Sequence, residues 1–126
     1  MKTLVSNFQQ VETYLTDFTP PVRMMRIKYD LSNMLALMTY LGNPQESYKV
    51  IHVAGTSGKT STAYYIAGLL KQTGKKIGLT VSPHVNDINE RIQIDLMPLK
   101  EEAFCTEFNK FLRLIEGAPI RPTYFE

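Results

Sequence analysis

A glycine-rich turn that ends in a lysine constrains this chain more than any other feature. The turn, Gly-Thr-Ser-Gly-Lys-Thr-Ser at residues 55–61, follows the apolar run 50–53 and precedes a segment with apolar residues at helical spacing. A strand, a tight turn and a helix in this order point backbone N–H groups and a helix N-terminus toward one place. That arrangement suits a polyphosphate, so we expect a nucleoside triphosphate to bind there.

Within the turn we expect Lys59 to place a mobile positive charge beside the phosphates, and the hydroxyl of Thr60 or Ser61 to bind Mg²⁺. The common phosphate-binding loop has a further glycine where this chain has Val53, so the loop is a short variant. The alternative is an ordinary strand-to-helix turn, in which the glycines serve the backbone alone and the lysine is solvated. The strand before the turn and the hydroxyls beside the lysine favour the nucleotide site. Its expected residues are Gly55, Thr56, Ser57, Gly58, Lys59, Thr60 and Ser61.

Composition excludes several other classes of protein. With 126 residues, 44% hydrophobic and 21% charged, the chain has the size and balance of one globular domain. A net charge of +2 gives no argument for a nucleic-acid partner. The longest apolar run, 34–38, is far shorter than a membrane span, and the N-terminus lacks the apolar core of a signal peptide. The single cysteine, Cys105, fits a reducing compartment, so we expect a cytoplasmic protein with no membrane partner.

Hydrophobic periodicity and turn residues predict an alternation of helices and strands. In chain order, the expected elements are helix 6–17, helix 30–41, strand 49–54, helix 60–73, strand 76–81, strand 91–95 and helix 100–116. Pro20 and Pro21 separate the first two helices, and Gly74 ends the helix after the loop. Two strands joined by one helix make a βαβ unit, which predicts a parallel strand pair with a right-handed crossover.

Several further segments show that the chain resembles the folylpolyglutamate synthase/dihydrofolate synthase family of the Mur ligase superfamily. These segments are Leu-Gly-Asn-Pro-Gln at 41–45, residues 48–56, Ser-Pro-His at 82–84, Asp87 with Asn-Glu-Arg-Ile at 89–92, and residues 122–126. The phosphate loop is shared with the cell-wall Mur ligases, whereas Ser-Pro-His and Asn-Glu-Arg-Ile are more specific to the folate family. The chain departs from the family at Ser57, usually asparagine, and at Thr60, usually glycine.

The resemblance implies an α/β, P-loop NTPase-like three-layer fold with a parallel sheet, and a single partial ATP-binding domain over residues 1–126. Residues 1–45 would form an N-terminal helical segment, and 46–126 a P-loop βαβ core that is incomplete at its C-terminus. Family members continue beyond the segment that starts at Tyr124, and their later residues complete the magnesium sites and bind glutamate. The resemblance therefore implies an N-terminal fragment that is inactive alone, from a protein that is a monomer at full length.

The implied reaction transfers the γ-phosphate of ATP to a carboxylate of folate or dihydropteroate, and the acyl phosphate is then attacked by the amine of L-glutamate. Such chemistry depends on positioning and charge neutralisation, for which Lys59 would be the catalytic residue. Thr60 or Ser61 would bind one Mg²⁺ and Ser82 a second one. The residues expected beside the acceptor substrate are Ser82, Pro83, His84 and Arg91.

Other interpretations remain open for these residues and for the function. Ser82 is also a common turn residue, His84 can serve as a loop hydrogen-bonding residue, and Arg91 can pair with Glu90 at the surface. The alternative functions are another Mur-type amide ligase acting on a cell-wall precursor, and a non-catalytic P-loop nucleotide-binding module.

Overall fold

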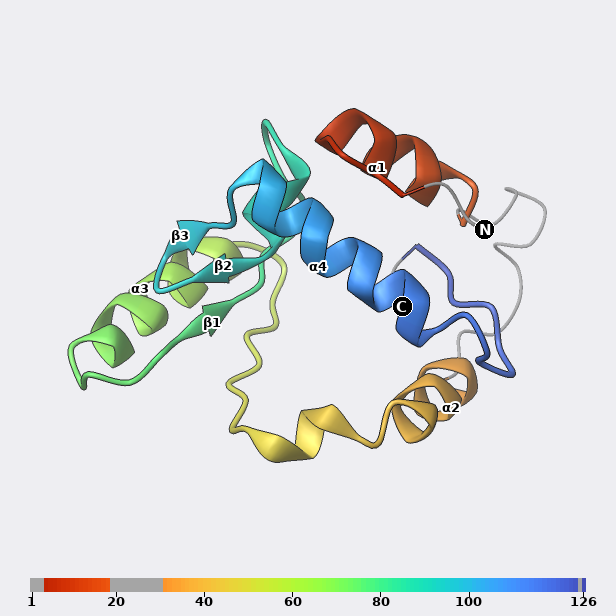
Figure 1. Ribbon diagram of the computed structural model, residues 1–126. Helices are drawn as coiled ribbons and strands as arrows, with labels where there is room; N and C mark the ends of the chain where they lie inside the picture. The colour runs from red at the N-terminus through yellow and green to blue at the C-terminus, as the bar shows by residue number, and fades with distance from the viewer. Residues whose placement is uncertain (1–3, 19–30, 125) are drawn as a thin grey trace. The chain divides into compact units, whose positions relative to one another are not determined.

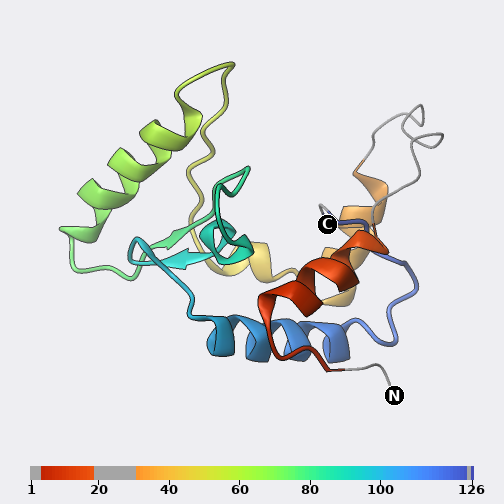
Figure 2. The same cartoon turned by 90° about the horizontal axis from the view of Figure 1, so that it is seen from above.

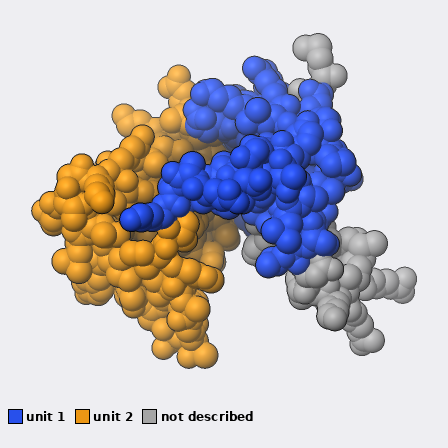
Figure 3. Space-filling model, turned by 90° about the horizontal axis from the view of Figure 1, so that it is seen from below, with its two compact units in different colours: residues 1–49, 106–126 blue, residues 50–105 orange. Residues whose placement is uncertain are grey.

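A computed structural model describes residues 4–18, 31–124 and 126 of the chain (Figure 1). The chain divides into two compact units, coloured separately in Figure 3. The first unit comprises residues 1–49 and 106–126, and the second comprises residues 50–105. Helix α4 (Glu101–Leu114) begins in the second unit and ends in the first. No helix among the described residues combines the length and apolar character needed to cross a membrane.

The first unit is helical. It contains α1 (Phe8–Thr16), α2 (Ser32–Tyr40), the 3₁₀ helix η2 (Pro44–Ser47) and most of α4. Helix α1 begins where the side chain of Asn7 accepts a hydrogen bond from the backbone N–H of Gln10 at 2.9 Å. The predictions of helices over 6–17, 30–41 and 100–116 are thereby confirmed. Pro20 and Pro21 lie outside the described residues.

One apolar cluster holds the first unit together. Leu37 of α2 and Leu112 of α4 are buried in its centre, and Tyr14 of α1 packs edge-on against Phe108 with ring centroids 5.7 Å apart. These contacts use one face of each helix, as the helical spacing of apolar residues predicts. The N-terminal segment is tied to α4 by Asn109, whose side chain accepts from Val5 N–H at 3.0 Å and donates to Val5 C=O at 2.8 Å.

The second unit consists of one helix, a 3₁₀ helix and three very short strands. They are α3 (Lys59–Lys71), β1 (Gly78–Leu79), η3 (Ile88–Arg91), β2 (Gln93–Ile94) and β3 (Met97–Pro98). In Figures 1 and 2 the chain turns back after α3 and enters β1. Gly74 occupies this turn with a φ of 73°, in agreement with the prediction that it ends the helix.

The sheet differs from the prediction. Its order is β1-β2-β3 and both pairs are antiparallel, with Gly78 opposite Ile94 and Ile94 opposite Met97. The expected parallel pair between 49–54 and 76–81 is wrong for the described residues, because 49–54 forms no strand. Val50 and Ile51 are 68% and 60% exposed. A β-branched sequence becomes a strand only when a neighbour takes up its backbone hydrogen bonds and covers its side chains, and β1 pairs with β2 instead.

The hairpin between β2 and β3 was missed, because its turn lacks the usual glycine or asparagine. Asp95 and Leu96 occupy the turn with φ values of 52° and 68°, a conformation that side chains larger than glycine rarely adopt. The Asp95 carboxylate accepts from Ile77 N–H at 2.9 Å, and the backbone N–H of Asp95 donates to Ile77 C=O at 2.8 Å. The Leu96 side chain lies over Gly68 of α3, where an added Cβ would meet it at 3.9 Å. These contacts hold a turn that local preference disfavours.

Candidate nucleotide-binding site

The loop 55–61 leads directly into the first turn of α3. Gly55 has a φ of 157° and Gly58 a φ of 74°, so both positions use the backbone freedom of glycine. Gly58 is the N-cap residue, and a Cβ placed on it would meet nothing within 4 Å. The backbone at this position therefore faces open space, which permits a ligand to approach it closely.

The N-terminus of α3 offers several backbone donors. The first helical hydrogen bond runs from Thr62 N–H to Gly58 C=O at 2.9 Å, and the N-cap makes no side-chain capping bond. The N–H groups of residues 59–61 precede that bond, so they have no acceptor within the helix. The thirteen-residue helix adds the partial positive charge of its dipole at the same end. This end of α3 is suited to an anion.

The lysine of the loop folds back over it. Lys59 Nζ donates to Gly55 C=O at 2.6 Å, so the ammonium group lies at the start of the loop. Residues 55–61 are all exposed, so the loop is open to solvent along its length. The hydroxyls of Thr60 and Ser61 lie in the first turn of α3, beside the lysine.

The Ser-Pro-His segment follows β1 and forms an irregular loop with a cis peptide bond between Ser82 and Pro83. Ser82 and Pro83 are exposed, and His84 is partly buried. Arg91 lies seven residues further on and donates from Nε to Nδ1 of His84 at 2.8 Å. We call residues 82–91 the second loop. The structure brings His84 and Arg91 into contact in this loop, as it brings Gly55 and Lys59 into contact in the loop 55–61.

The residues around Arg91 have structural roles that the sequence analysis did not assign. The Glu90 carboxylate accepts from the N–H groups of Val85, Asn86 and Asp87 at 2.7, 2.8 and 3.2 Å. These backbone bonds hold the pKa of Glu90 below its usual range. Glu90 and Asp87 also form a capping box on η3. The spacing Asp-x-x-Glu is the signal from which this role could have been found.

Gln93 was also missed by the sequence analysis, although it is 1% exposed. Its amide group donates to the hydroxyl of Tyr64 on α3 and to Glu90 C=O at 2.9 Å. Nearby, Asn89 donates to Leu99 C=O at 2.7 Å. A polar residue in a short alternating strand carries no sequence signal for burial. These bonds fix the end of the second loop to α3 and to the segment before α4.

The described residues contain no cluster of three or more histidine, cysteine or acidic side chains that could hold a metal ion. The metal ligands predicted from the sequence are hydroxyls on two segments, with Thr60 and Ser61 on α3 and Ser82 after β1. Hydroxyls alone are weak ligands for Mg²⁺, which usually takes carboxylate or phosphate oxygens as well.

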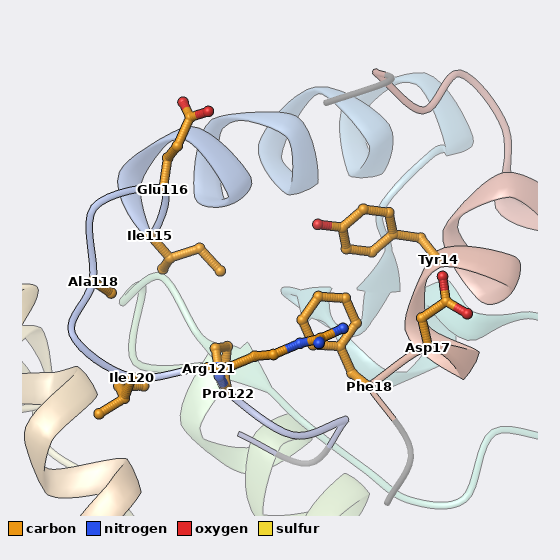
Figure 4. Close-up of a pocket in the computed structure, with 9 residues that line it drawn as sticks. All are labelled: Tyr14, Asp17, Phe18, Ile115, Glu116, Ala118, Ile120, Arg121 and Pro122. Carbon is orange, nitrogen blue, oxygen red and sulfur yellow. The ribbon is translucent and has the colours of Figure 1, made fainter. Parts of the chain in front are cut away.

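A separate pocket of about 310 Å³ lies in the first unit (Figure 4). Arg121 crosses the ring of Phe18 there, with its Cζ 5.0 Å from the ring centroid. None of the residues predicted to bind nucleotide or substrate lines this pocket. Its lining residues are Tyr14, Asp17, Phe18, Ile115, Glu116, Ala118, Ile120, Arg121 and Pro122.

Comparison with known proteins links the second unit to one family. The Mur ligase middle domain matches residues 53–108. Dihydrofolate synthase/folylpolyglutamate synthase of Mycobacterium tuberculosis is 36% identical over 111 residues, which cover 88% of this chain and 22% of that protein.

Two solved structures are similar at the level of the fold. The folylpolyglutamate synthase of Mycobacterium tuberculosis complexed with ADP superposes with a TM-score of 0.76 at 36% identity, covering 86% of this chain and 23% of that one. An FPGS–AMPPCP–folate complex has a TM-score of 0.76 at 34% identity, covering 94% of this chain and 29% of that one. The chain spans only 14% to 24% of the length of four curated relatives that it matches.

Proposed function

The chain belongs to the folylpolyglutamate synthase/dihydrofolate synthase family of the Mur ligase superfamily, and from this premise we propose that it supplies the phosphate-binding part of an ATP-dependent ligase. The ligase adds L-glutamate to a folate or to dihydropteroate through an acyl phosphate. The observation that carries the proposal is the loop 55–61, which joins an exposed helix N-terminus to a lysine that reaches back to Gly55. Related structures contain ADP, and AMPPCP with folate.

In this proposal the backbone N–H groups of residues 59–61 bind phosphate oxygens. Lys59 exchanges its bond to the Gly55 carbonyl for the β- and γ-phosphates, because a phosphate carries more negative charge than a carbonyl. Thr60 or Ser61 then binds Mg²⁺ at the phosphates, and the phosphate oxygens complete the coordination that hydroxyls cannot supply alone. Lys59 is the catalytic residue in the sense that it neutralises charge on the transferred phosphoryl group.

The acceptor substrate is assigned to the second loop, at Ser82, Pro83, His84 and Arg91. Ser82 follows the C-terminal end of β1, and the adjoining residues 85–87 are fixed by Glu90. We assign Ser82 to a second Mg²⁺ that requires carboxylates from outside the described residues. The P-loop NTPase-like three-layer fold stays a prediction, and so does a single partial ATP-binding domain over residues 1–126.

The net charge of +2 gives no argument for a nucleic-acid partner. We propose a cytoplasmic protein that is a monomer at full length. Cys105 is a free, buried cysteine, and burial raises the pKa of its thiol, with Glu101 adding to the effect. A protonated, inaccessible thiol is consistent with packing and with a reducing compartment.

The nucleotide site is tested with the 126-residue chain by calorimetric titration with ATP and Mg²⁺. Lys59→Ala is expected to weaken binding by about ten- to a hundredfold, because a lost charge-assisted contact is worth about 1.5–3 kcal/mol. Lys75→Ala, which removes an exposed lysine after α3, is the charge-matched control and should bind as the wild type does. Equal affinity of the wild type and Lys59→Ala would contradict the assignment of the loop.

The acceptor is tested with a longer protein that carries this sequence. Phosphate release from ATP is expected only when glutamate is present together with a folate or dihydropteroate. Turnover with a UDP-linked muramyl substrate and none with a folate would assign the protein to the cell-wall branch. ATP binding without any acceptor-dependent turnover would favour the non-catalytic nucleotide-binding module.

A further inference from the structure

The hydrogen bond between Arg91 and His84 determines where the imidazole carries its proton. The Nε–H of Arg91 points at Nδ1 of His84 at 2.8 Å, and an arginine can only donate. Nδ1 must therefore accept, which it can do only in a neutral imidazole whose single proton is on Nε2. We propose that Arg91 is a positioning residue that fixes this tautomer, so that His84 presents an N–H donor to an oxygen atom of the bound ligand.

Arg91 can impose this choice because its own position is fixed from several sides. It ends η3, and the capping box between Asp87 and Glu90 closes that helix. Asn89 ties the helix to Leu99 C=O at 2.7 Å. Ile88 is 3% exposed and anchors the same turn in the interior. The arginine thus extends from a rigid base rather than from a free loop.

The partner ring is held by the same short segment. The Glu90 carboxylate accepts hydrogen bonds of 2.7 to 3.2 Å from the backbone N–H groups of residues 85–87, which directly follow His84. Asn89, Glu90 and Arg91 therefore bind three different targets: the chain before α4, the backbone after His84, and the His84 ring itself. Two of these residues act on His84, since Glu90 holds the backbone that follows it and Arg91 holds its ring.

The fixed tautomer selects the chemistry of the ligand. An Nε2–H donor attracts a carbonyl, carboxylate or phosphate oxygen, and it disfavours an amide or amino N–H in the same place. The guanidinium of Arg91 adds positive charge behind the ring, which favours an oxygen with negative charge. This inference rests on the proposed function for the identity of the ligand, which offers two sources of such an oxygen: the acceptor substrate and the phosphates of the nucleotide.

The tautomer is tested on the 126-residue chain by long-range ¹H–¹⁵N NMR of the imidazole rings at a pH where both are neutral. The chain has only two histidines, and His52 is exposed, so it serves as an internal reference for a ring in exchange between tautomers. His84 is expected to show the Nε2–H form alone, with a scalar coupling across the hydrogen bond from Arg91 Nε to His84 Nδ1. An averaged pattern like that of His52, or an Nδ1–H form, would overturn the proposal without any variant.

Variants then test whether Arg91 is the cause. Arg91→Ala should remove the coupling and shift His84 to the averaged pattern, whereas Arg113→Ala, which removes an exposed arginine on α4, should leave His84 unchanged. A fixed Nε2–H form that persists in a folded Arg91→Ala protein would refute the positioning role. If that variant does not fold, the scalar coupling in the wild-type chain decides whether Arg91 Nε donates to His84 Nδ1.

The ligand is tested by adding folate, or AMPPCP with Mg²⁺, to separate samples. A shift of the His84 Nε2 resonance with folate identifies the acceptor substrate as the source of the oxygen, and a shift with AMPPCP identifies the phosphates. If AMPPCP shifts the resonances of residues 55–61 but neither compound shifts Nε2, the donor role is wrong. No shift at 55–61 would contradict the proposed function instead, while the tautomer result, obtained without ligand, would stand.

Discussion

Glu90 shows how a surface carboxylate can act on the backbone rather than on another charge. Its two oxygens bind three consecutive N–H groups, and the Nε of Arg91, the next residue in the sequence, donates to His84. The sequence alone left open a surface pair between Glu90 and Arg91. At the scale of single residues, the loop after Pro83 is ordered by main-chain bonds to one carboxylate.

These three hydrogen bonds to Glu90 predict that the order of the loop after Pro83 depends on pH. Because the pKa of Glu90 is lowered in the folded chain, its contribution is complete above the ordinary pKa of a glutamate and is lost as the pH falls through the lowered value. We expect the Val85 and Asn86 amides to lose protection below that pH, measured as the ratio of the intrinsic to the observed exchange rate. Glu90→Gln should abolish this pH dependence, and Glu12→Gln on the exposed face of α1 should not. Protection at these two amides that does not change with pH would contradict the role of Glu90.

One glycine inside α3 and one in the turn after it predict opposite effects of the same change. Gly68 lies inside the helix, and a Cβ there would meet Leu96 Cδ1 at an ordinary 3.9 Å, so Gly68→Ala should stabilise by about 0.5–1 kcal/mol. Gly74 has a φ of 73°, so Gly74→Ala should destabilise by about 1 kcal/mol. The midpoints of denaturant unfolding measure both. A loss of stability in Gly68→Ala would mean that Leu96 packs more tightly on the helix than this distance allows.

At the scale of elements, α4 organises the first unit through one polar residue as well as through its apolar face. Asn109 makes two hydrogen bonds to Val5, which imitate the pairing of a neighbouring strand. Asn109→Ala should release the N-terminal segment, at a cost of about 1–2 kcal/mol, and Val5 N–H should lose protection in hydrogen exchange. Lys110→Ala removes only an exposed ion pair with Glu107 and should change stability by less than about 0.5 kcal/mol. Unchanged protection of Val5 in Asn109→Ala would count against this anchor.

Helices were predictable from this sequence and the sheet was not, for a physical reason. A helix satisfies its own backbone, so the apolar spacing over 100–116 and the glycine after 60–73 were enough to locate α4 and α3. A strand depends on a neighbour, and the sequence of 49–54 does not say whether one is present. The hairpin at Asp95 and Leu96 was hidden because tertiary contacts, not turn residues, hold it.

The local geometry of the candidate site was predictable to a similar extent, whereas its binding roles stay predictions. The glycines and the lysine of the loop could be identified from their spacing, because each meets a local requirement of the turn. The bond between Arg91 and His84 could not, since it depends on the path of the chain between them. Nor could the burial of Gln93, which follows from its bond to Tyr64 on another element.

At the scale of the whole molecule, the chain spans 14% to 24% of the length of four of the curated relatives that it matches. The described residues offer hydroxyls but no acidic cluster for a metal. We therefore expect the 126-residue chain, supplied with ATP, Mg²⁺, folate and glutamate, to release no phosphate above the blank in a coupled assay. Release that depends on all the substrates and disappears in Lys59→Ala would disprove this expectation.

The segment around Val50 and Ile51 has a consequence for how this chain behaves in concentrated solution. Tyr48, Val50 and Ile51 are each at least 60% exposed, and within the described residues 49–54 belongs to no sheet. A short, β-branched stretch with free backbone groups is a template for intermolecular pairing, and only Lys49 places a formal charge within it. Aggregation of the purified chain should therefore begin here, and Ile51→Lys should slow the growth of light scattering while leaving the α3 region folded.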